Sequence, residues 1–370
     1  MIEQTDMQTK TSDYHFELPG HLIAQYPSAE RGQSRLMVMR RKEGSLEHRM
    51  LRDLPSILES GTLMVFNNSR VRKARLYGVS ETGGAECEFL LLSKILESGD
   101  GMPPGETGRL WKVLVKRARR RRQGSRYVFG NGKSSEKIGA EITGGDGEYR
   151  RLKFDRPIDD AWLDIHGHVP LPPYIRRNDL CEDAQRYQTV YAEEYGSAAA
   201  PTAGLHFTEE LLGDLTKAGI ETAFITLHVG LGTFLPVRAE NIEEHRMHEE
   251  TYSINEETAS QIERARAGGR KVLAVGTTSV RTLESAWEED PSMPGAGKLR
   301  RGEGSTSIFI YPPYRFKAID AIFTNFHTPS STLLMLVSAF AGRDFILESY
   351  KEAIREGYHF FSYGDACLLL

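Results

Sequence analysis

The alternation of apolar and polar positions predicts a helix followed by a strand between residues 196 and 237. A polar, glycine-rich loop ends at Thr208, a good helix N-cap that two acidic residues follow in the first turn. Gly219 is typical of a helix end, and the next run, IETAFITLHV, is rich in strand-forming residues and leads into a second glycine-rich turn. Because a loop before a helix N-terminus presents free backbone N–H groups, this stretch suits an anionic or polar ligand.

The order of apolar strand, polar loop and helix recurs twice further along the chain. In KVLAVGTTSVRTLES a strand meets Gly276 and a helix opens at Thr277. In AIDAIFTNFHTPSSTLLMLVSAFAG a strand meets Asn325, and a helix follows from about Ser331. One such loop alone is more simply a turn with good caps. Three together predict polar groups gathered at one end of a sheet, where α/β folds bind ligands.

The middle of the chain has a different pattern. From about residue 70 to 153, short alternating apolar runs are split by glycines and show little helical period, which predicts a small antiparallel β-barrel or sandwich. The flanking segments have α/β character, so we interpret the module as an insertion. The sequence thus predicts an α/β large domain with an inserted small antiparallel β-barrel domain. The boundaries are a disordered tail at 1–12, a discontinuous α/β domain at 13–66 and 154–370, and the barrel at 67–153.

Charge is unevenly distributed along the 370 residues. The whole chain carries −4, but the segment from Ser69 to Lys153 holds 19 Lys and Arg against 10 Asp and Glu, so it carries +9 and the rest −13. A basic module on an acidic body predicts a polyanionic partner. The densest run of positive charge in this module lies at residues 116–122. Such runs are often only solvated surface, yet cations this close repel one another unless a polyanion binds them. We predict nucleic-acid phosphate contacts from Lys116, Arg117, Arg119, Arg120, Arg121 and Arg122.

A proline-stiffened segment, GHVPLPPYIRR, offers a second candidate contact with RNA. It ends in Arg176 and Arg177, with Tyr174, Arg186 and Tyr187 nearby. Each of these residues alone is more often structural, and only the cluster favours phosphate contacts and base stacking.

Composition excludes several other classes of protein. Hydrophobic residues make up 39% and charged residues 26% of the chain, no apolar run approaches the ~18 residues of a membrane span, and the N-terminus lacks the apolar core of a signal peptide. The three cysteines form no CxxC pair, which fits a reducing cytoplasm and argues against a zinc site. His245 and His248 are spaced for one helical face, but no third ligand is identifiable, so no metal is expected.

Nine segments, taken in order, closely resemble one family of enzymes. They are DYHFELPGHLIAQYP, RLWKVLVKRARR, GHVPLPPYIRR, RYQTVYA, AAPTAGLHFTEELL, TLHVGLGTFLPVR, AVGTTSVRTLES, YRFKAIDAIFTNFHTPSSTLLMLVSAFAG and FFSYGDA, and they span nearly the whole chain from about Asp13. The resemblance is to the S-adenosylmethionine:tRNA ribosyltransferase-isomerases of queuosine biosynthesis. The chain departs from the family pattern at Asn68, Ser69, Pro313 and Ser330, where Asp, Thr, Gly and Lys are usual.

The resemblance implies a reaction and a setting. The ribosyl moiety of S-adenosylmethionine is transferred and isomerised onto 7-aminomethyl-7-deazaguanine at the wobble position of tRNA, giving epoxyqueuosine-tRNA, adenine and methionine. S-adenosylmethionine is then a substrate, the partner is tRNA that carries the deazaguanine, and neither a metal nor a membrane is involved. We expect a cytoplasmic monomer.

Histidines suit the proton transfers of this reaction because their pKa lies near 7. We therefore predict that His206, His228 and His327 face the ligand as catalytic groups, although any single one could be structural. Hydrogen bonds to the substrate are expected from hydroxyl and amide groups in the three loops, and a carboxylate contact from an arginine fork. These substrate-binding residues are Thr202, Thr277, Thr278, Ser279, Arg281 and Asn325.

Two other functions fit parts of the sequence. A non-catalytic RNA-binding protein with this fold would use the basic run but would have no use for histidines at the sheet end. A methyltransferase that uses S-adenosylmethionine would need a glycine-rich loop after its first strand, which the sequence does not contain. The released product distinguishes the three functions. A ribosyltransferase-isomerase releases adenine, a methyltransferase releases S-adenosylhomocysteine, and a binding protein releases neither.

Overall fold

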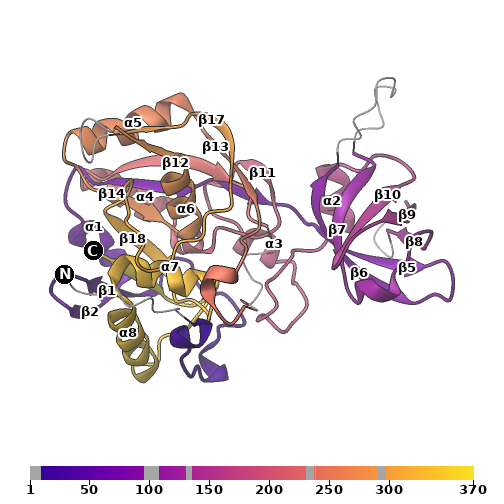
Figure 1. Cartoon of the computed structure of the whole chain (residues 1–370), viewed down its shortest axis with the longest axis horizontal. Coiled ribbons are helices and arrows are strands. Elements are labelled where there is room, and N and C mark those ends of the chain that lie inside the picture. Colours follow the sequence, from indigo (N-terminus) through magenta and orange to yellow (C-terminus); the bar gives the residue numbers. More distant parts are fainter. Residues whose placement is uncertain (1–9, 96–107, 131–135, 231–236, 238, 291–296) are drawn as a thin grey trace.

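The computed structural model describes residues 10–95, 108–130, 136–230, 237, 239–290 and 297–370. They form a large α/β body and a small barrel, joined by narrow connections (Figure 1). Residues 1–9 of the predicted tail lie outside the described residues. Lys10 forms a β-bridge with Asn241, and a 3-10 helix follows at Thr11–Tyr14.

A nine-stranded mixed sheet is the centre of the large domain. Its strands are β1 (Arg35–Arg40), β2 (Ser45–Met50), β3 (Leu63–Asn67), β12 (Glu221–Leu227), β13 (Glu250–Ile254), β14 (Val272–Val275), β17 (Gly302–Thr306), β18 (Ala321–Asn325) and β19 (Ala366–Leu369). The order is β17-β13-β12-β3-β14-β18-β19-β1-β2. Strands β12, β3, β14 and β18 are parallel to one another, so their carboxyl ends share one edge. Strands β3, β14 and β18 are buried along their whole length, as near-continuous apolar runs in parallel sheets usually are.

Helices cover both faces of this sheet (Figure 1). They are α1 (Leu54–Ile57), α4 (Glu209–Lys217), α5 (Glu256–Ala267), α6 (Thr277–Ala286), α7 (Thr332–Ala341) and α8 (Arg343–Arg355). Apolar side chains of α5 to α8 pack with one face of the strands, and those of α1 and α4 with the other. Thr208 accepts a hydrogen bond from the Leu211 N–H at 3.1 Å, which confirms the predicted N-cap of α4.

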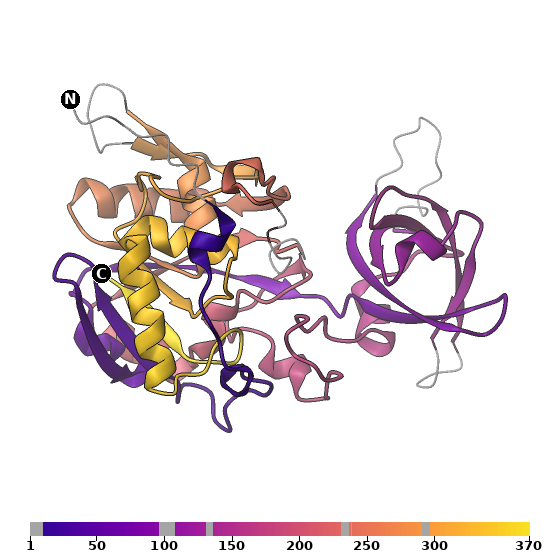
Figure 2. The ribbon, with the colours of Figure 1, turned by 60° about the horizontal axis from the view of Figure 1, so that its bottom comes forward.

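The inserted module is a closed barrel of six antiparallel strands, seen nearly end-on in Figure 2. The strands are β5 (Arg75–Ser80), β6 (Glu86–Lys94), β7 (Leu110–Val115), β8 (Arg126–Phe129), β9 (Ile138–Gly144) and β10 (Tyr149–Phe154), in the order β10-β7-β6-β5-β8-β9. Inward-facing aromatic residues such as Phe89, Trp111 and Tyr127 fill its core. The predicted α/β domain with an inserted antiparallel barrel is confirmed.

Short elements connect the two domains. Strand β4 (Ser69–Val71), just before the barrel, pairs in parallel with β11 (Glu194–Ser197) of the large domain. After the barrel come α2 (Asp160–His166) and α3 (Asp183–Arg186). A two-stranded ribbon, β15 (Trp287–Glu289) with β16 (Gly297–Leu299), lies beside α5.

Candidate active site

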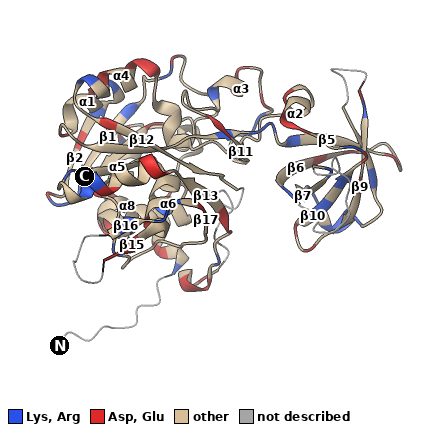
Figure 3. Cartoon of the chain, turned by 90° about the horizontal axis from the view of Figure 1, so that it is seen from above, with Lys and Arg blue, Asp and Glu red and all other residues tan. Residues whose placement is uncertain are grey.

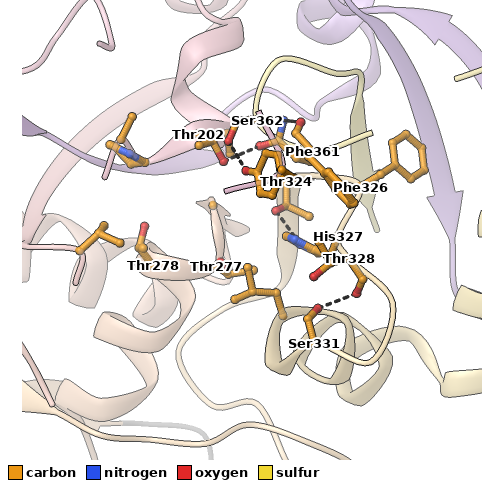
Figure 4. Close-up of a pocket in the computed structure, with 18 of the residues that line it drawn as sticks. Thr202, Thr277, Thr278, Thr324, Phe326, His327, Thr328, Ser331, Phe361 and Ser362 are labelled. Atoms are coloured by element: carbon orange, nitrogen blue, oxygen red, sulfur yellow. Dashed lines mark hydrogen bonds between the residues drawn. The ribbon is translucent and has the colours of Figure 1, made fainter. Parts of the chain in front are cut away.

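A pocket lies at the shared carboxyl edge of the parallel strands (Figure 4). It is lined by residues of all three polar loops predicted to meet there: Thr202 before α4, Thr277 and Thr278 at the start of α6, and Asn325 and His327 after β18. The predicted gathering of the loops is confirmed. None of the described residues that line the pocket is Asp, Glu, Lys or Arg. The pocket is thus neutral, rich in hydroxyl groups and walled elsewhere by apolar side chains.

The turn between β14 and α6 brings backbone close to the ligand space. Gly276 has φ +85°, and a Cβ there would lie 3.4 Å from the Cβ of Ala203, so glycine suits this left-handed position. Thr277 and Thr278 follow as the first residues of α6, and these residues are 7% and 6% exposed. Because the first turn of a helix has free N–H groups, this wall offers hydrogen-bond donors to an anion.

The loop after β18 builds the opposite wall. Ser331 caps α7 by accepting a hydrogen bond from the Leu334 N–H at 3.1 Å, and its hydroxyl donates to the Thr328 carbonyl at 2.8 Å. A second helix N-terminus therefore borders the pocket. Ser330, where the family pattern has Lys, has φ +55° and does not line the pocket.

Asn325 is the centre of a buried hydrogen-bond network. Its Nδ2 donates to His206 Nε2 at 2.8 Å and to the Phe361 carbonyl at 3.1 Å, and its Oδ1 accepts from the Thr202 hydroxyl at 3.0 Å. His206 Nδ1 in turn lies 2.7 Å from Ser34 Oγ. Because His206 Nε2 accepts the hydrogen bond from Asn325, the neutral tautomer is assigned, in which Nδ1 carries the proton and donates to Ser34. His206 does not line the pocket, and its hydrogen bond to Asn325 links it to a residue that does.

His327 lines the pocket directly. Its Nε2 lies 3.1 Å from Thr324 Oγ1, and its backbone N–H donates to the Tyr350 hydroxyl at 3.1 Å. If Nε2 carries the proton and donates to Thr324, Nδ1 has a free lone pair. Burial lowers the pKa of His327 to about 3, so the imidazole is neutral at pH 7.

These two buried histidines make stability depend on pH. Burial, then the charge of Arg31, lowers the pKa of His206 to about 4. An unfolded histidine titrates near 6.5, so the unfolded chain binds the extra protons first, and stability present above about pH 6.5 is lost as the pH falls toward 4. We expect each histidine to cost about 1.4 kcal/mol of unfolding free energy per pH unit in that window.

Urea unfolding at several pH values checks this. Relative to the wild type, His327→Gln should flatten the acid loss by about one proton. An unchanged slope in His327→Gln would show that this imidazole does not titrate between the folded and unfolded states.

His228 lies outside this pocket, at the clefts beyond β12. One cleft is bordered by Arg72, Lys112 and Tyr149 of the barrel and its linker, so it lies between the two domains. The imidazole packs against Gly196, where a Cβ would come within 2.6 Å of the ring. Burial, followed by the charge of Arg72, lowers the pKa of His228. The structure therefore brings His206 and His327 to the same region and places His228 at a neighbouring one.

Two other predicted ligand contacts are engaged elsewhere. The Ser279 hydroxyl donates to the Val275 carbonyl at 2.8 Å within α6 and its preceding strand. Arg281, expected to meet a ligand carboxylate, donates instead to the buried Glu250 carboxylate of β13. Neither Ser279 nor Arg281 lines the pocket.

The predicted phosphate-binding residues lie mostly on the surface. Figure 3 shows Lys and Arg on the barrel around β7 and β10. In the run after β7, Arg121 is half-buried and stacks over Tyr127, while the other cations are exposed: Lys116, Arg117, Arg119, Arg120 and Arg122. On the large domain Arg176 is exposed, and Arg177 makes a two-pronged ion pair with Asp183.

Sequence reasoning missed the aromatic side of the pocket. Tyr174 and Phe361 pack with ring centroids 4.6 Å apart, and the Tyr174 hydroxyl lies 2.5 Å from Ser362 Oγ. Phe361 has φ +72°, a conformation unusual for a non-glycine residue. The motif FFSYGDA carries the family resemblance but gives no direction for Phe361, and Tyr174 was expected to stack on RNA and not to line this pocket.

Within the described ranges, no three His, Cys, Asp or Glu side chains come together as metal ligands. His245 instead packs on Phe309, and His248 contacts Tyr149 of the barrel. No helix among the described residues is both long and apolar enough to cross a membrane.

Comparison with known proteins places the chain among tRNA-modifying enzymes. A family model described as queuosine biosynthesis protein matches residues 11–369. A relative from Treponema denticola named S-adenosylmethionine:tRNA ribosyltransferase-isomerase is 53% identical over 360 residues, which cover 97% of this chain and 99% of the relative. A relative of the same name from Clostridioides difficile is 47% identical over 361 residues, with 97% and 99% covered. The crystal structure of S-adenosylmethionine tRNA ribosyltransferase from Thermotoga maritima is 36% identical, with a TM-score of 0.52 over 97% of this chain and 100% of that one.

Fold, pocket and relatives together define a tRNA-modifying transferase with two domains. The chain belongs to the queuosine biosynthesis family of S-adenosylmethionine:tRNA ribosyltransferase-isomerases, as the sequence motifs predicted.

Proposed function

We propose that the pocket binds S-adenosylmethionine and that the enzyme transfers and isomerises its ribosyl moiety onto 7-aminomethyl-7-deazaguanine at the wobble position of tRNA. The products are epoxyqueuosine-tRNA, adenine and methionine. The observation that carries the proposal is the neutral, hydroxyl-rich pocket between the N-termini of α6 and α7, in a chain whose relatives are named for this substrate.

The electrostatics of the pocket suit a sulfonium zwitterion. A cationic lining would repel the sulfonium, but Lys and Arg are absent from the described lining and both nearby histidines are neutral at pH 7. The substrate carboxylate would meet the first turn of α6, where Thr277 and Thr278 add hydroxyl donors. Thr202 and Asn325 would contact the remaining polar groups, whereas Ser279 and Arg281 would act only by supporting α6.

The chemistry requires several proton transfers. A proton must leave the carbon beside the sulfonium, the attacking aminomethyl group must be neutral, and adenine leaves more easily when protonated. Methionine departs as a neutral thioether, so the departure needs no metal to stabilise it. A group that takes and returns protons next to the substrate therefore meets the main need.

Among the three histidines, His327 is the best candidate for this group because it alone lines the pocket. Its pKa of about 3 is well below the value near 7 from which the sequence prediction argued, so its position and not its pKa supports the assignment. His206 would position Asn325 through the 2.8 Å hydrogen bond and so fix the amide that faces Thr202. His228, at the cleft beside the barrel, would contact the incoming nucleotide of the tRNA.

The barrel would supply affinity for tRNA. Its exposed cations after β7 are suited to phosphate contacts that carry no sequence preference, and Arg176 and Arg177 would extend them on the large domain. We further propose that the enzyme acts as a monomer. Its tRNA affinity should fall with salt, in proportion to the phosphates contacted.

Adenine release from S-adenosylmethionine tests the reaction. We expect release to require tRNA that carries 7-aminomethyl-7-deazaguanine, and the same tRNA without the aminomethyl group serves as the control. Release of S-adenosylhomocysteine would indicate a methyltransferase. Bound tRNA with no release of either product would indicate a binding protein, and both results would reject the proposal.

A further inference from the structure

Two arginines of the large domain lie beside each other next to the candidate active site. Arg31, in the loop before β1, and Arg186, at the end of α3, border a small hollow together with Ser34 and His206. Ser362 lines both this hollow and the candidate active site, so the two share a wall.

Backbone carbonyls hold the two guanidinium groups in place. Arg31 donates to the carbonyls of Gln188 at 2.8 Å and Gln185 at 3.0 Å. Arg186 donates in the opposite direction, to the carbonyl of Ser28 at 2.7 Å. The two side chains therefore cross-link the same two segments, and their positions are fixed before any ligand binds.

Neither arginine has a carboxylate partner within the described part of the chain. Burial, and then the positive charge of Arg186, lowers the pKa of Arg31. The two guanidinium groups therefore repel each other. The Nε of Arg186 is buried without a hydrogen-bond partner. Nearby Arg177 is different because the Asp183 carboxylate compensates it with two hydrogen bonds. Two fixed, adjacent and uncompensated guanidinium groups attract an anion, and their fork geometry matches phosphate oxygens.

An exposed aromatic residue lies on the same segment. Tyr26 is 58% exposed, and the guanidinium carbon of Arg177 lies 4.5 Å from the centre of its ring. Arg177 also donates to the Gln25 carbonyl at 2.8 Å, which holds it against this segment. Proteins bind single-stranded nucleic acid by combining cations that contact its phosphate backbone with exposed aromatic rings on which its bases stack.

We propose that Arg31 and Arg186 bind a phosphodiester of the tRNA strand beside the nucleotide that enters the candidate active site. The proposal rests on the proposed function for the identity of that strand. The shared wall at Ser362 places the phosphate next to the pocket, so the contact would hold the strand in register with the reacting base. Free phosphate presents the same chemistry and is the alternative occupant.

Binding of deazaguanine-bearing tRNA over salt concentrations from about 50 to 200 mM tests this. Arg31→Gln and Arg186→Gln should each weaken binding and lower the slope of log affinity against log salt by about 0.7 to 0.9. Arg186→Lys, which keeps the charge, should retain most of the slope. Arg264→Gln, which removes an exposed cation from α5, is the matched control and should leave the slope unchanged. The barrel variant Arg119→Gln/Arg120→Gln/Arg122→Gln removes three cations at once. Its change in slope calibrates the change expected for each lost cation.

Three results would overturn the proposal. An unchanged slope in both glutamine variants, with normal thermal stability, would remove the phosphate contact. A lower thermal stability of the variants with an unchanged slope would show that the two arginines only cross-link the two segments and do not bind phosphate. Inorganic phosphate that binds the wild type and not the variants, with tRNA affinity unaltered, would assign the hollow to free phosphate. This test measures tRNA binding and not turnover. If the proposed reaction were wrong, the adenine-release experiment would show it, and the binding test could still be interpreted.

Discussion

His327→Gln is expected to lower the rate of adenine release by about 10²- to 10⁴-fold, the usual contribution of a general acid or base. Glutamine is close to histidine in size and can still hydrogen bond to Thr324, 3.1 Å from the imidazole in the wild type, but it cannot take up a proton. Affinity for S-adenosylmethionine should change little because the hydroxyl groups and helix N-termini of the pocket remain. Single-turnover release and equilibrium binding of S-adenosylmethionine measure the two effects separately.

His21→Gln is the control, since His21 is exposed and is not among the residues that line the pocket. Thr324→Val, which removes the hydrogen bond that orients the imidazole, should fall between the control and His327→Gln. If His327→Gln retained more than about a tenth of the wild-type rate, the proton transfer would have to be assigned to another group.

Asn325→Leu is expected to abolish turnover and to lower the free energy of unfolding by about 2–6 kcal/mol. Leucine has the same number and branching of side-chain heavy atoms as asparagine, so the main loss comes from hydrogen bonding. It leaves the Phe361 carbonyl and His206 Nε2 buried without their donor, and it frees the Thr202 hydroxyl. Each buried polar group left unpaired costs about 1–3 kcal/mol. Thr202 and Phe361 both line the pocket, so its shape should change along with stability.

Urea unfolding and adenine release, measured on the same preparations, test this second expectation. Thr324→Val, in the same strand and 1% exposed, leaves one buried group, His327 Nε2, without its partner and should cost less, about 1–3 kcal/mol. Wild-type stability in Asn325→Leu would mean that water or a rearranged loop satisfies these partners. The network would then not be the element that fixes the pocket.

Sequence reasoning went furthest where local pattern decides structure. The apolar runs of β14 and β18 predicted buried strands. The cap at Thr208 predicted where α4 begins, and the pattern placed the start of α7 at about Ser331. The polar loops that follow could be placed at one edge because parallel strands point the same way. That reasoning needs only short-range information and the rules of α/β sheets.

Long-range pairing limited the rest. Arg281 follows Thr277 by one helical turn, yet its partner, Glu250, lies on β13, and no local pattern could indicate that ion pair. His206 and Asn325 are 119 positions apart, and only the fold shows that the histidine contacts the amide. Phe361 enters the pocket from the segment before β19, where the sequence shows no strand, loop and helix order.

The place of β19 in the sheet bears on how the chain is synthesised. It follows every other described strand in chain order, yet it lies between β18 and β1. The hairpin of β1 and β2 is among the first elements to leave the ribosome, and it can join the central strands only after β19 has emerged. The barrel, from β5 to β10, is contiguous and can fold while the ribosome is still translating the second half of the large domain. Ser34, just before β1, can therefore settle against His206 only as one of the last steps. The pocket is completed by the same event that closes the sheet.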